Sequence, residues 1–353
     1  MMKGVGALEA EYCGLGIFRQ PVERNAGGVP SSPAQVVAHD TMTLDSESGG
    51  PRGGTPLSFV SSPSPPARDI QPLSRPVQEF LFPMTDALAQ RLTAAQSIAR
   101  EAGTLARRYY RDRHSLQWES KGVQNWVSEA DKAVEDLIRD RLAEAFPDDA
   151  FLGEESGRSG GAGPVWVVDP IDGTTMFLRG IAYWCVSIAL VAEGVLELGV
   201  IYDPLADEMF AGRRGHGAQC NGRPMRVSTV CELSQAVVGV GFSHRRPTGP
   251  VSDWLGRLLA AKGEYRQLGA GALMLAHAAD GRLDGYYECH HHSWDALAGL
   301  LLNREAGAWT NDFLAGDGLY EGSPIFVCPP ALRPGLAELI KAAGLPHGDG
   351  EIG

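Results

Sequence analysis

Two carboxylates that end an apolar run are the residues of this sequence best suited to chemistry. Asp169 and Asp172 follow Val165–Val168, whose apolar pattern predicts a short buried strand, and Gly173-Thr174 opens a predicted helix. Carboxylates are hard oxygen ligands for Mg²⁺, and a helix N-terminus suits an anion such as phosphate. Taken alone, however, these residues are more simply interpreted as an Asp-Pro turn followed by a helix cap.

Three other acidic residues have a distinctive setting. Glu154 follows a short apolar run, Asp295 comes directly after Trp294, and Asp131 belongs to a predicted capping box that begins at Ser128. Buried carboxylates are costly unless they are hydrogen-bonded or paired with a cation. Several together therefore indicate a metal cluster, although Asp131 and Asp295 would also each suit a helix cap.

Composition excludes several classes of function. A net charge of -12 argues against nucleic acid as a main partner. No segment approaches the roughly 20 apolar residues of a membrane span, and the N-terminus lacks the apolar run of a signal peptide, so we expect a cytoplasmic protein without a membrane partner. The six cysteines form no C-x-x-C pair, which favours reduced thiols over disulfides or a zinc site.

The chain divides into three parts by composition and periodicity. Residues 1–83 hold 11 of the 23 prolines and 10 of the 44 glycines without any persistent period, which predicts a disordered N-terminal extension. This extension is either an upstream addition to the reading frame or a tail. Residues 84–222 form a predicted N-terminal α+β part that carries the metal motifs. Residues 223–353 form a predicted C-terminal α/β part that completes the active site.

The periodic segments indicate an α+β fold. A helical stripe begins near Thr85, and a second helix follows the capping box at Ser128. Residues 183–220 then predict a run of short antiparallel strands, and strands and helices alternate after Arg223. Helices followed by antiparallel strands are typical of α+β proteins.

Three motifs in this order resemble those of the inositol monophosphatase family. They are Glu154-Glu155, Asp169-Pro-Ile-Asp-Gly-Thr174 and Trp294-Asp-Ala-Leu-Ala-Gly299, and the resemblance extends from about residue 86 to 340. The family consists of Mg²⁺-dependent, lithium-sensitive phosphomonoesterases. The resemblance therefore implies a hydrolase, a layered α-β-α-β-α sandwich and, as is usual in the family, a homodimer.

The resemblance also implies a ligand set for two or three Mg²⁺ ions. Glu154 and Asp169 would bind one ion together with the carbonyl oxygen of Ile171. Asp169, Asp172 and Asp295 would bind a second, and a weaker third ion would lie near Glu154. Two such cations can activate a water molecule and neutralise the leaving oxygen, which is the main requirement of phosphoryl transfer.

Further roles follow from the same resemblance. Thr174, beside Asp131, would orient the attacking water and help to deprotonate it together with Glu154. The backbone N–H groups of Gly173 and Thr174 would hold phosphate oxygens. Lys121 matches a family lysine near the metal site.

Substrate choice would depend on residues outside these motifs. Glu288 has the position of a family glutamate that contacts polyol hydroxyls, although it would also suit an exposed strand end. Residues 266–271 match the segment that lines the substrate, with Gly269 and Ala270 in contact. Ala270 replaces a common hydroxyl residue, and Met176 replaces a usual asparagine. These two departures weaken the case for inositol phosphate itself.

The histidine run His290–His292 is a less promising metal site. Alternate side chains of an extended segment point apart, so three adjacent histidines cannot all face one ion. One of them could contact substrate, but we expect solvent-facing loop histidines.

We therefore expect an enzyme that hydrolyses inositol monophosphate or a similar polyol phosphate. The alternative on the same fold is a histidinol-phosphate phosphatase, because a fold does not determine the substrate. A non-catalytic interaction protein is the third hypothesis, and the complete set of predicted ligands argues against it.

Overall fold

The computed structural model describes residues 81–122, 125–243 and 246–346, and all of them belong to one compact unit. The predicted N-terminal extension lies outside the described residues except for residues 81–83. Helix α1 (Leu81–Arg111) begins there, four residues before the expected start. The division of the chain near residue 222 remains a proposal.

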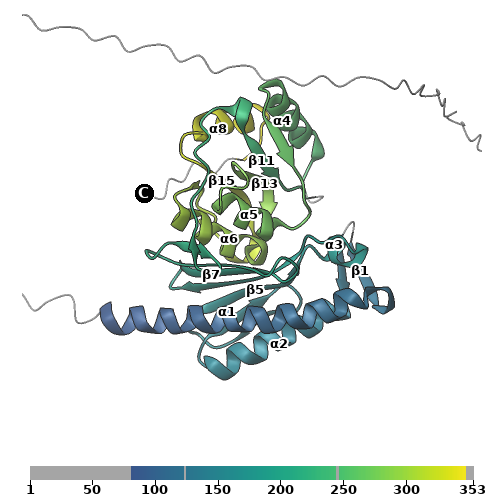
Figure 1. The fold of residues 1–353 in the computed structure, drawn as a ribbon, viewed down its shortest axis with the longest axis vertical. Coiled ribbons are helices and arrows are strands. Elements are labelled where there is room, and N and C mark those ends of the chain that lie inside the picture. The colour runs from purple at the N-terminus through teal and green to yellow at the C-terminus, as the bar shows by residue number, and fades with distance from the viewer. Residues whose placement is uncertain (1–80, 123–124, 244–245, 347–353) are drawn as a thin grey trace, which may run out of the picture. The chain divides into compact units, whose positions relative to one another are not determined.

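Three layers of helices enclose two sheets (Figure 1). The first layer covers the outer face of a larger sheet, the second lies between the sheets, and the third covers a smaller sheet. The layers contain, in that order, α1 and α2 (Glu129–Ala145), α5 (Gly271–Ala279) and α6 (Ser293–Ala306), and α4 (Thr248–Ala260) and α8 (Arg333–Ala342). This arrangement confirms the predicted layered α+β sandwich.

The larger sheet has eight strands, and its pairing brings two predicted ligands together. Its order is β10 (Arg223–Pro224), β9 (Ala218–Cys220), β8 (Glu208–Arg213), β7 (Val195–Asp203), β6 (Cys185–Ala192), β5 (Val165–Asp172), β3 (Ala150–Gly153) and β4 (Gly157–Gly160). Strands β3 and β5 are parallel, with Gly153 opposite Val168. Glu154 and Asp169 each follow one of these paired residues, so they lie side by side at the same end of the two strands.

The smaller sheet has five strands and carries the other half of the predicted site. Its order is β12 (Glu264–Arg266), β11 (Val237–Val240), β13 (Tyr286–His291), β15 (Ser323–Cys328) and β14 (Trp309–Thr310). Strand β13 leads directly into α6, so Glu288 and Asp295 lie on consecutive elements.

Several short elements complete the fold. They are the hairpin β1 (Trp118–Gly122) and β2 (Asn125–Ser128), the helices α3 (Thr174–Arg179) and α7 (Gly318–Glu321), and two 3₁₀ turns (Arg113–Ser115 and Leu233–Gln235). The Gly- and Ser-rich composition of residues 157–164 predicts a surface loop, but residues 157–160 form β4, an edge strand whose side chains are mostly exposed. Backbone pairing at an edge does not require apolar side chains, so the pattern did not indicate it.

The first helical layer packs as the sequence indicates. Helix α1 buries a stripe of small residues that contains Ala95, Ala99, Ala102 and Ala106, all fully buried. Small side chains at spacings of three and four let the helix lie close to the sheet. The capping box at Ser128 is confirmed, since Asp131 accepts the Ser128 N–H at 2.8 Å. Among the described helices, none is long and apolar enough to cross a membrane.

Candidate functional site

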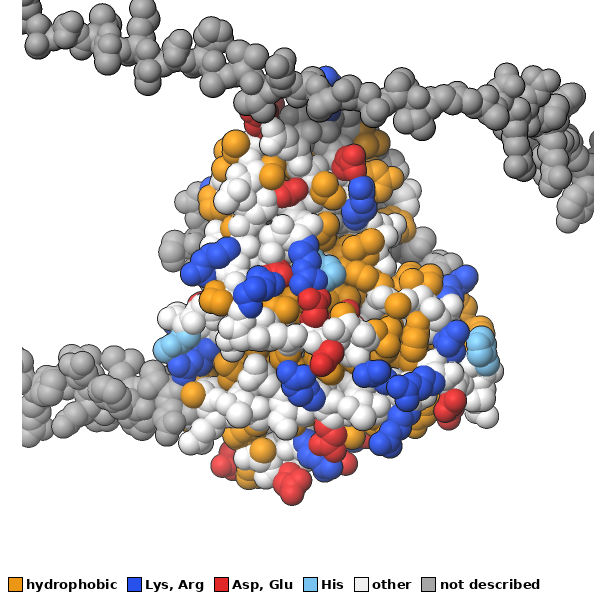
Figure 2. Space-filling view, viewed as in Figure 1, with side chains coloured by type: hydrophobic (Ala, Val, Ile, Leu, Met, Phe, Trp, Pro, Cys, Tyr) orange, Lys and Arg blue, Asp and Glu red, His pale blue; other side chains and the backbone are white. Residues whose placement is uncertain are grey.

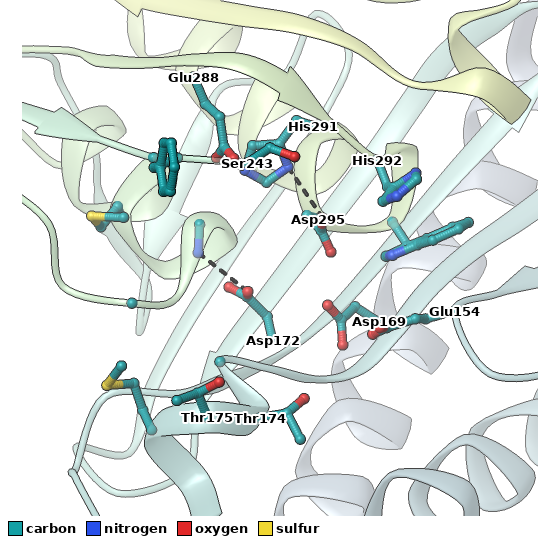
Figure 3. Close-up of a pocket in the computed structure, with 18 of the residues that line it drawn as sticks. Glu154, Asp169, Asp172, Thr174, Thr175, Ser243, Glu288, His291, His292 and Asp295 are labelled. Atoms are coloured by element: carbon teal, nitrogen blue, oxygen red, sulfur yellow. Dashed lines mark hydrogen bonds and ion pairs between the residues drawn. The ribbon is translucent and has the colours of Figure 1, made fainter. Parts of the chain in front are cut away.

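A cavity of about 730 Å³ lies where β3 and β5 end, and it reaches the smaller sheet. Its lining includes all five predicted ligands, the carboxylates of Glu154, Asp169, Asp172 and Asp295 and the residue Ile171. Figure 3 shows these carboxylates around one space, with Thr174 on one side and Glu288 on the other. Segments far apart in the sequence therefore converge as the motifs predicted.

Three of the carboxylates form a group that could hold a metal ion. Glu154, Asp169 and Asp295 each place one oxygen within 4.8 Å of the others. Burial, followed by the negative charges of Glu154, Asp295 and Asp172, raises the pKa of Asp169 well above its usual value. Like charges held this close together are unfavourable without a cation, and the all-oxygen donor set is the one that Mg²⁺ prefers. The residues present therefore fit the implied metal.

Asp172 lines the same cavity but is tied to the helix across it. Its Oδ2 accepts the N–H of Ala272 at 2.7 Å, and its Oδ1 accepts that of Gly271 at 3.2 Å, so the carboxylate lies at the N-terminus of α5. Burial and the neighbouring Asp295 raise the pKa of Asp172 to about 7, although these N–H groups act in the opposite direction. Asp172 thus joins the first sheet to the middle helical layer at the site.

A threonine and a buried aspartate lie beside the carboxylates. Gly173 has a φ of +92° where the chain turns into α3, and Thr174 is the first residue of that helix. The Thr174 hydroxyl lies 3.2 Å from Asp131 Oδ1 and 3.1 Å from the Ile171 carbonyl oxygen, and can donate to either. Asp131 is fully buried behind Thr174 and does not line the cavity, so it acts on the cavity only through this hydroxyl.

One buried carboxylate near the site was missed by the sequence reasoning. Glu135 on α2 is 1% exposed, and it accepts the backbone N–H groups of Glu155 and Ser156, both at 2.8 Å. It therefore holds the turn that carries Glu154. A signal existed, because Asp131 and Glu135 are four residues apart and so share the buried face of one helix.

The prediction of solvent-facing loop histidines is wrong. Strand β13 runs to His291, three residues further than the predicted end, and it buries His290 and His291 to 9% and 5% exposure. The imidazole Nδ1 of His291 lies 3.3 Å from Asp295 Oδ2, and its Nε2 lies 3.0 Å from Glu288 Oε2. Although burial favours the neutral ring, these two carboxylates raise the pKa of His291 well above its usual value.

The predicted substrate contacts are divided between the cavity and its surroundings. Glu288 and Gly269 line the cavity, and Glu288 is mostly buried rather than an exposed strand end. Ala270 is 1% exposed, is absent from the lining, and has its Cβ close to Gly173. Lys121 is part of β1, but its side chain lies outside the described residues.

Comparison with known proteins gives the family. A family model described as the inositol monophosphatase family matches residues 87–344. The chain belongs to the inositol monophosphatase family. This membership confirms the resemblance, and it confirms the expected class of enzyme, a phosphoric monoester hydrolase.

The matches to several relatives extend over most of each relative's length. Inositol-1-monophosphatase of Mesorhizobium japonicum is 38% identical over 247 residues, which are 69% of this chain and 93% of the relative. Nus factor SuhB of Escherichia coli (strain K12) is 37% identical over 229 residues, 64% of this chain and 86% of the relative. The crystal structure of the extragenic suppressor protein suhB from Bartonella henselae matches with a TM-score of 0.68 and 36% identity, covering 71% of this chain and 98% of that one.

Proposed function

We propose that the chain is a Mg²⁺-dependent phosphomonoesterase that acts on inositol monophosphate or a similar polyol phosphate. The observation that carries the proposal is the convergence of Glu154, Asp169 and Asp295 within 4.8 Å beside the N-terminus of α3. Mg²⁺ held by these carboxylates, as two or three ions with Asp172 and the Ile171 carbonyl, would supply an activated water and neutralise charge on the phosphoryl group.

The chain's own residues would orient the reaction. Thr174, held by Asp131, offers a hydroxyl to the attacking water, and Glu154 lies on the same side to accept its proton. The backbone N–H groups of Gly173 and Thr174 begin α3 and would bind phosphate oxygens. These contacts place and polarise the reactants, which is what phosphoryl transfer requires of the protein.

Glu288 supports a polyol as the leaving group. Its carboxylate lines the cavity, and carboxylate oxygens accept hydrogen bonds from vicinal hydroxyls. A relative named Inositol-1-monophosphatase supports the same choice. Histidinol phosphate is the alternative substrate, because Met176, which lines the cavity, departs from the family pattern.

A comparison of two substrates tests the proposal. We expect kcat/KM for inositol 1-phosphate to exceed that for histidinol phosphate when Mg²⁺ is present, and we expect added Li⁺ to inhibit both reactions. Replacement Asp169→Asn should abolish turnover of both, because it removes the central carboxylate. A preference for histidinol phosphate would replace our first choice with the alternative.

Partners form a separate part of the proposal. We expect a cytoplasmic homodimer that binds neither membrane nor nucleic acid. Figure 2 shows both basic and acidic side chains on one face, and the net charge of -12 supports the last point. One relative is named a Nus factor, so a non-catalytic interaction protein is the competing function. A wild-type protein that hydrolyses none of a panel of phosphate esters with Mg²⁺ would favour that reading.

A further inference from the structure

His291 connects the two functional halves of the cavity. Its Nδ1 faces Asp295, one of the three grouped carboxylates, and its Nε2 faces Glu288, the proposed polyol contact (Figure 3). At 5% exposure the ring has little contact with water. A single imidazole therefore spans the metal side and the substrate side of the site.

The substrate-side carboxylate is held by two groups at one of its oxygens. Tyr286 donates its hydroxyl to Glu288 Oε2 at 2.7 Å, and His291 Nε2 lies 3.0 Å from the same oxygen. His291 Nε2 also lies 3.1 Å from the Tyr286 hydroxyl, which closes a triangle of contacts. Among the described residues these contacts all fall on Oε2, which leaves Oε1 to accept a substrate hydroxyl.

Two glycines make room for this triangle. A methyl group on Gly241 would overlap the Glu288 carboxylate and the Tyr286 hydroxyl, and one on Gly271 would lie 2.5 Å from His291 Nε2. Neither glycine has the positive φ that would require glycine for backbone reasons. The close approach of the side chains therefore accounts for glycine at both positions.

His291 itself is placed beside the metal group rather than in it. Among the described residues, the group of mutually close ligand atoms contains oxygens of Glu154, Asp169 and Asp295 but no His291 nitrogen. His291 would therefore act on a bound cation through neighbouring carboxylates, chiefly Asp295, rather than as a ligand.

We propose that His291 is a positioning residue that couples Glu288 to Asp295, so that a change at the Glu288 carboxylate affects the binding of the metal. The contact of Glu288 with the substrate rests on the proposed function, whereas the effect of His291 on metal binding does not. Partners that orient a metal ligand typically change metal affinity by about 10- to 100-fold when removed. A neutral residue at position 288 would hold the imidazole less firmly, since hydrogen bonds to charged acceptors are roughly twice as strong as neutral ones.

A double-mutant cycle on metal binding tests the coupling. Mn²⁺ binding to the full chain is measured by calorimetry without substrate, for wild type, Glu288→Gln, His291→Leu and the double variant. We expect His291→Leu to weaken binding about tenfold. We expect Glu288→Gln to weaken binding at least about threefold more in wild type than in the His291→Leu background, because only wild type has the connecting ring. Equal effects in both backgrounds would overturn the proposal.

Two further variants separate this role from a general loss of structure. His290→Leu removes the neighbouring buried imidazole, whose Nε2 contacts the Glu321 carbonyl, and it should leave Mn²⁺ affinity within about twofold of wild type. His291→Gln keeps a hydrogen-bonding group and should bind Mn²⁺ more tightly than His291→Leu. If His291→Gln recovered no affinity and His290→Leu lost as much as His291→Leu, the role of His291 would be structural.

The KM for inositol 1-phosphate should rise in His291→Leu. Absence of turnover in wild type would contradict the proposed function and leave the metal cycle to decide the coupling.

Discussion

The carboxylate of Glu135 holds the backbone of Glu155, with Oε2 accepting the N–H at 2.8 Å. Its second oxygen accepts the N–H of Ser156, and a methyl group on Gly153 would overlap the same carboxylate. The turn after β3 is therefore built on a side chain from α2. Glu154 lies inside this turn, so Glu135, which is not a predicted ligand, positions one that is.

Replacement of Glu135 should weaken metal binding without removing a ligand. We expect Glu135→Gln to lower Mn²⁺ affinity about tenfold, because an amide can accept only one of the two backbone N–H groups. The measurement is calorimetric titration of the purified variant. Asp136→Asn is the matched control, since Asp136 is the next residue of α2 and its side chain is 60% exposed. Unchanged affinity in Glu135→Gln would show that the turn holds its shape without this carboxylate.

Thr174 gives a test of the water-orienting hydroxyl. We expect Thr174→Val to reduce kcat about 100-fold, because valine has nearly the same shape but cannot donate to Asp131 or contact the water. Thr174→Ser should retain most of the activity. Thr175→Val serves as the control, because Thr175 also lines the cavity and is the next residue of α3. Similar losses in the two valine variants would assign the effect to packing of α3.

The convergence of the four carboxylates could be predicted from motifs that resemble those of the family, because each motif also has a local signal. Asp169 ends a continuous apolar run, and the parallel pairing of β3 with β5 then brings Glu154 beside it. Asp295 follows a tryptophan at the start of a strongly helical segment. The α+β class followed from the order of helices and strands, because the periodicity of each long element was clear, whereas the layered arrangement was implied by the family resemblance.

The positioning residues could not be predicted, for two physical reasons. The end of β13 depends on pairing with β15 rather than on local pattern, and a shift of three residues converts His291 from a loop residue into a buried bridge. Glu135 has the spacing of a buried face, but its partners are backbone N–H groups about 20 residues away. Contacts with the backbone leave no pattern in residue type.

His277 should make stability depend on pH. Burial, with a smaller contribution from Arg282, lowers the pKa of His277 from 6.5 to about 4, and its Nδ1 lies 3.1 Å from the Tyr183 hydroxyl. Because the unfolded chain takes up this proton at a higher pH than the folded chain, stability present above pH 6.5 is lost as the pH falls towards 4. Between pH 7 and pH 5 we expect a loss of about 2 kcal/mol from this residue.

The measurement is urea unfolding of wild type and His277→Gln at several pH values. Glutamine does not titrate, so the difference in unfolding free energy between the two proteins should change by about 2 kcal/mol over this window. His216→Gln is the control, because it makes the same replacement at an exposed histidine. Parallel curves for wild type and His277→Gln would show that the His277 ring is protonated equally in both states.

Asp149 should be a main contributor to stability, because it joins α1 to the larger sheet. Its carboxylate, 3% exposed, accepts two hydrogen bonds from Arg91 at 3.1 and 3.0 Å and one from the Trp166 indole at 3.0 Å. Asp149→Ala would leave a partly buried guanidinium and an indole N–H without this acceptor, so we expect a loss of about 2 to 3 kcal/mol in urea unfolding. Asp253→Ala breaks an exposed pair with Arg257 on α4 and should cost less than about 1 kcal/mol. Because both variants break one ion pair between aspartate and arginine, the comparison separates the effect of burial from that of charge. Equal losses of unfolding free energy would mean that burial of the Asp149 carboxylate adds nothing to its contribution.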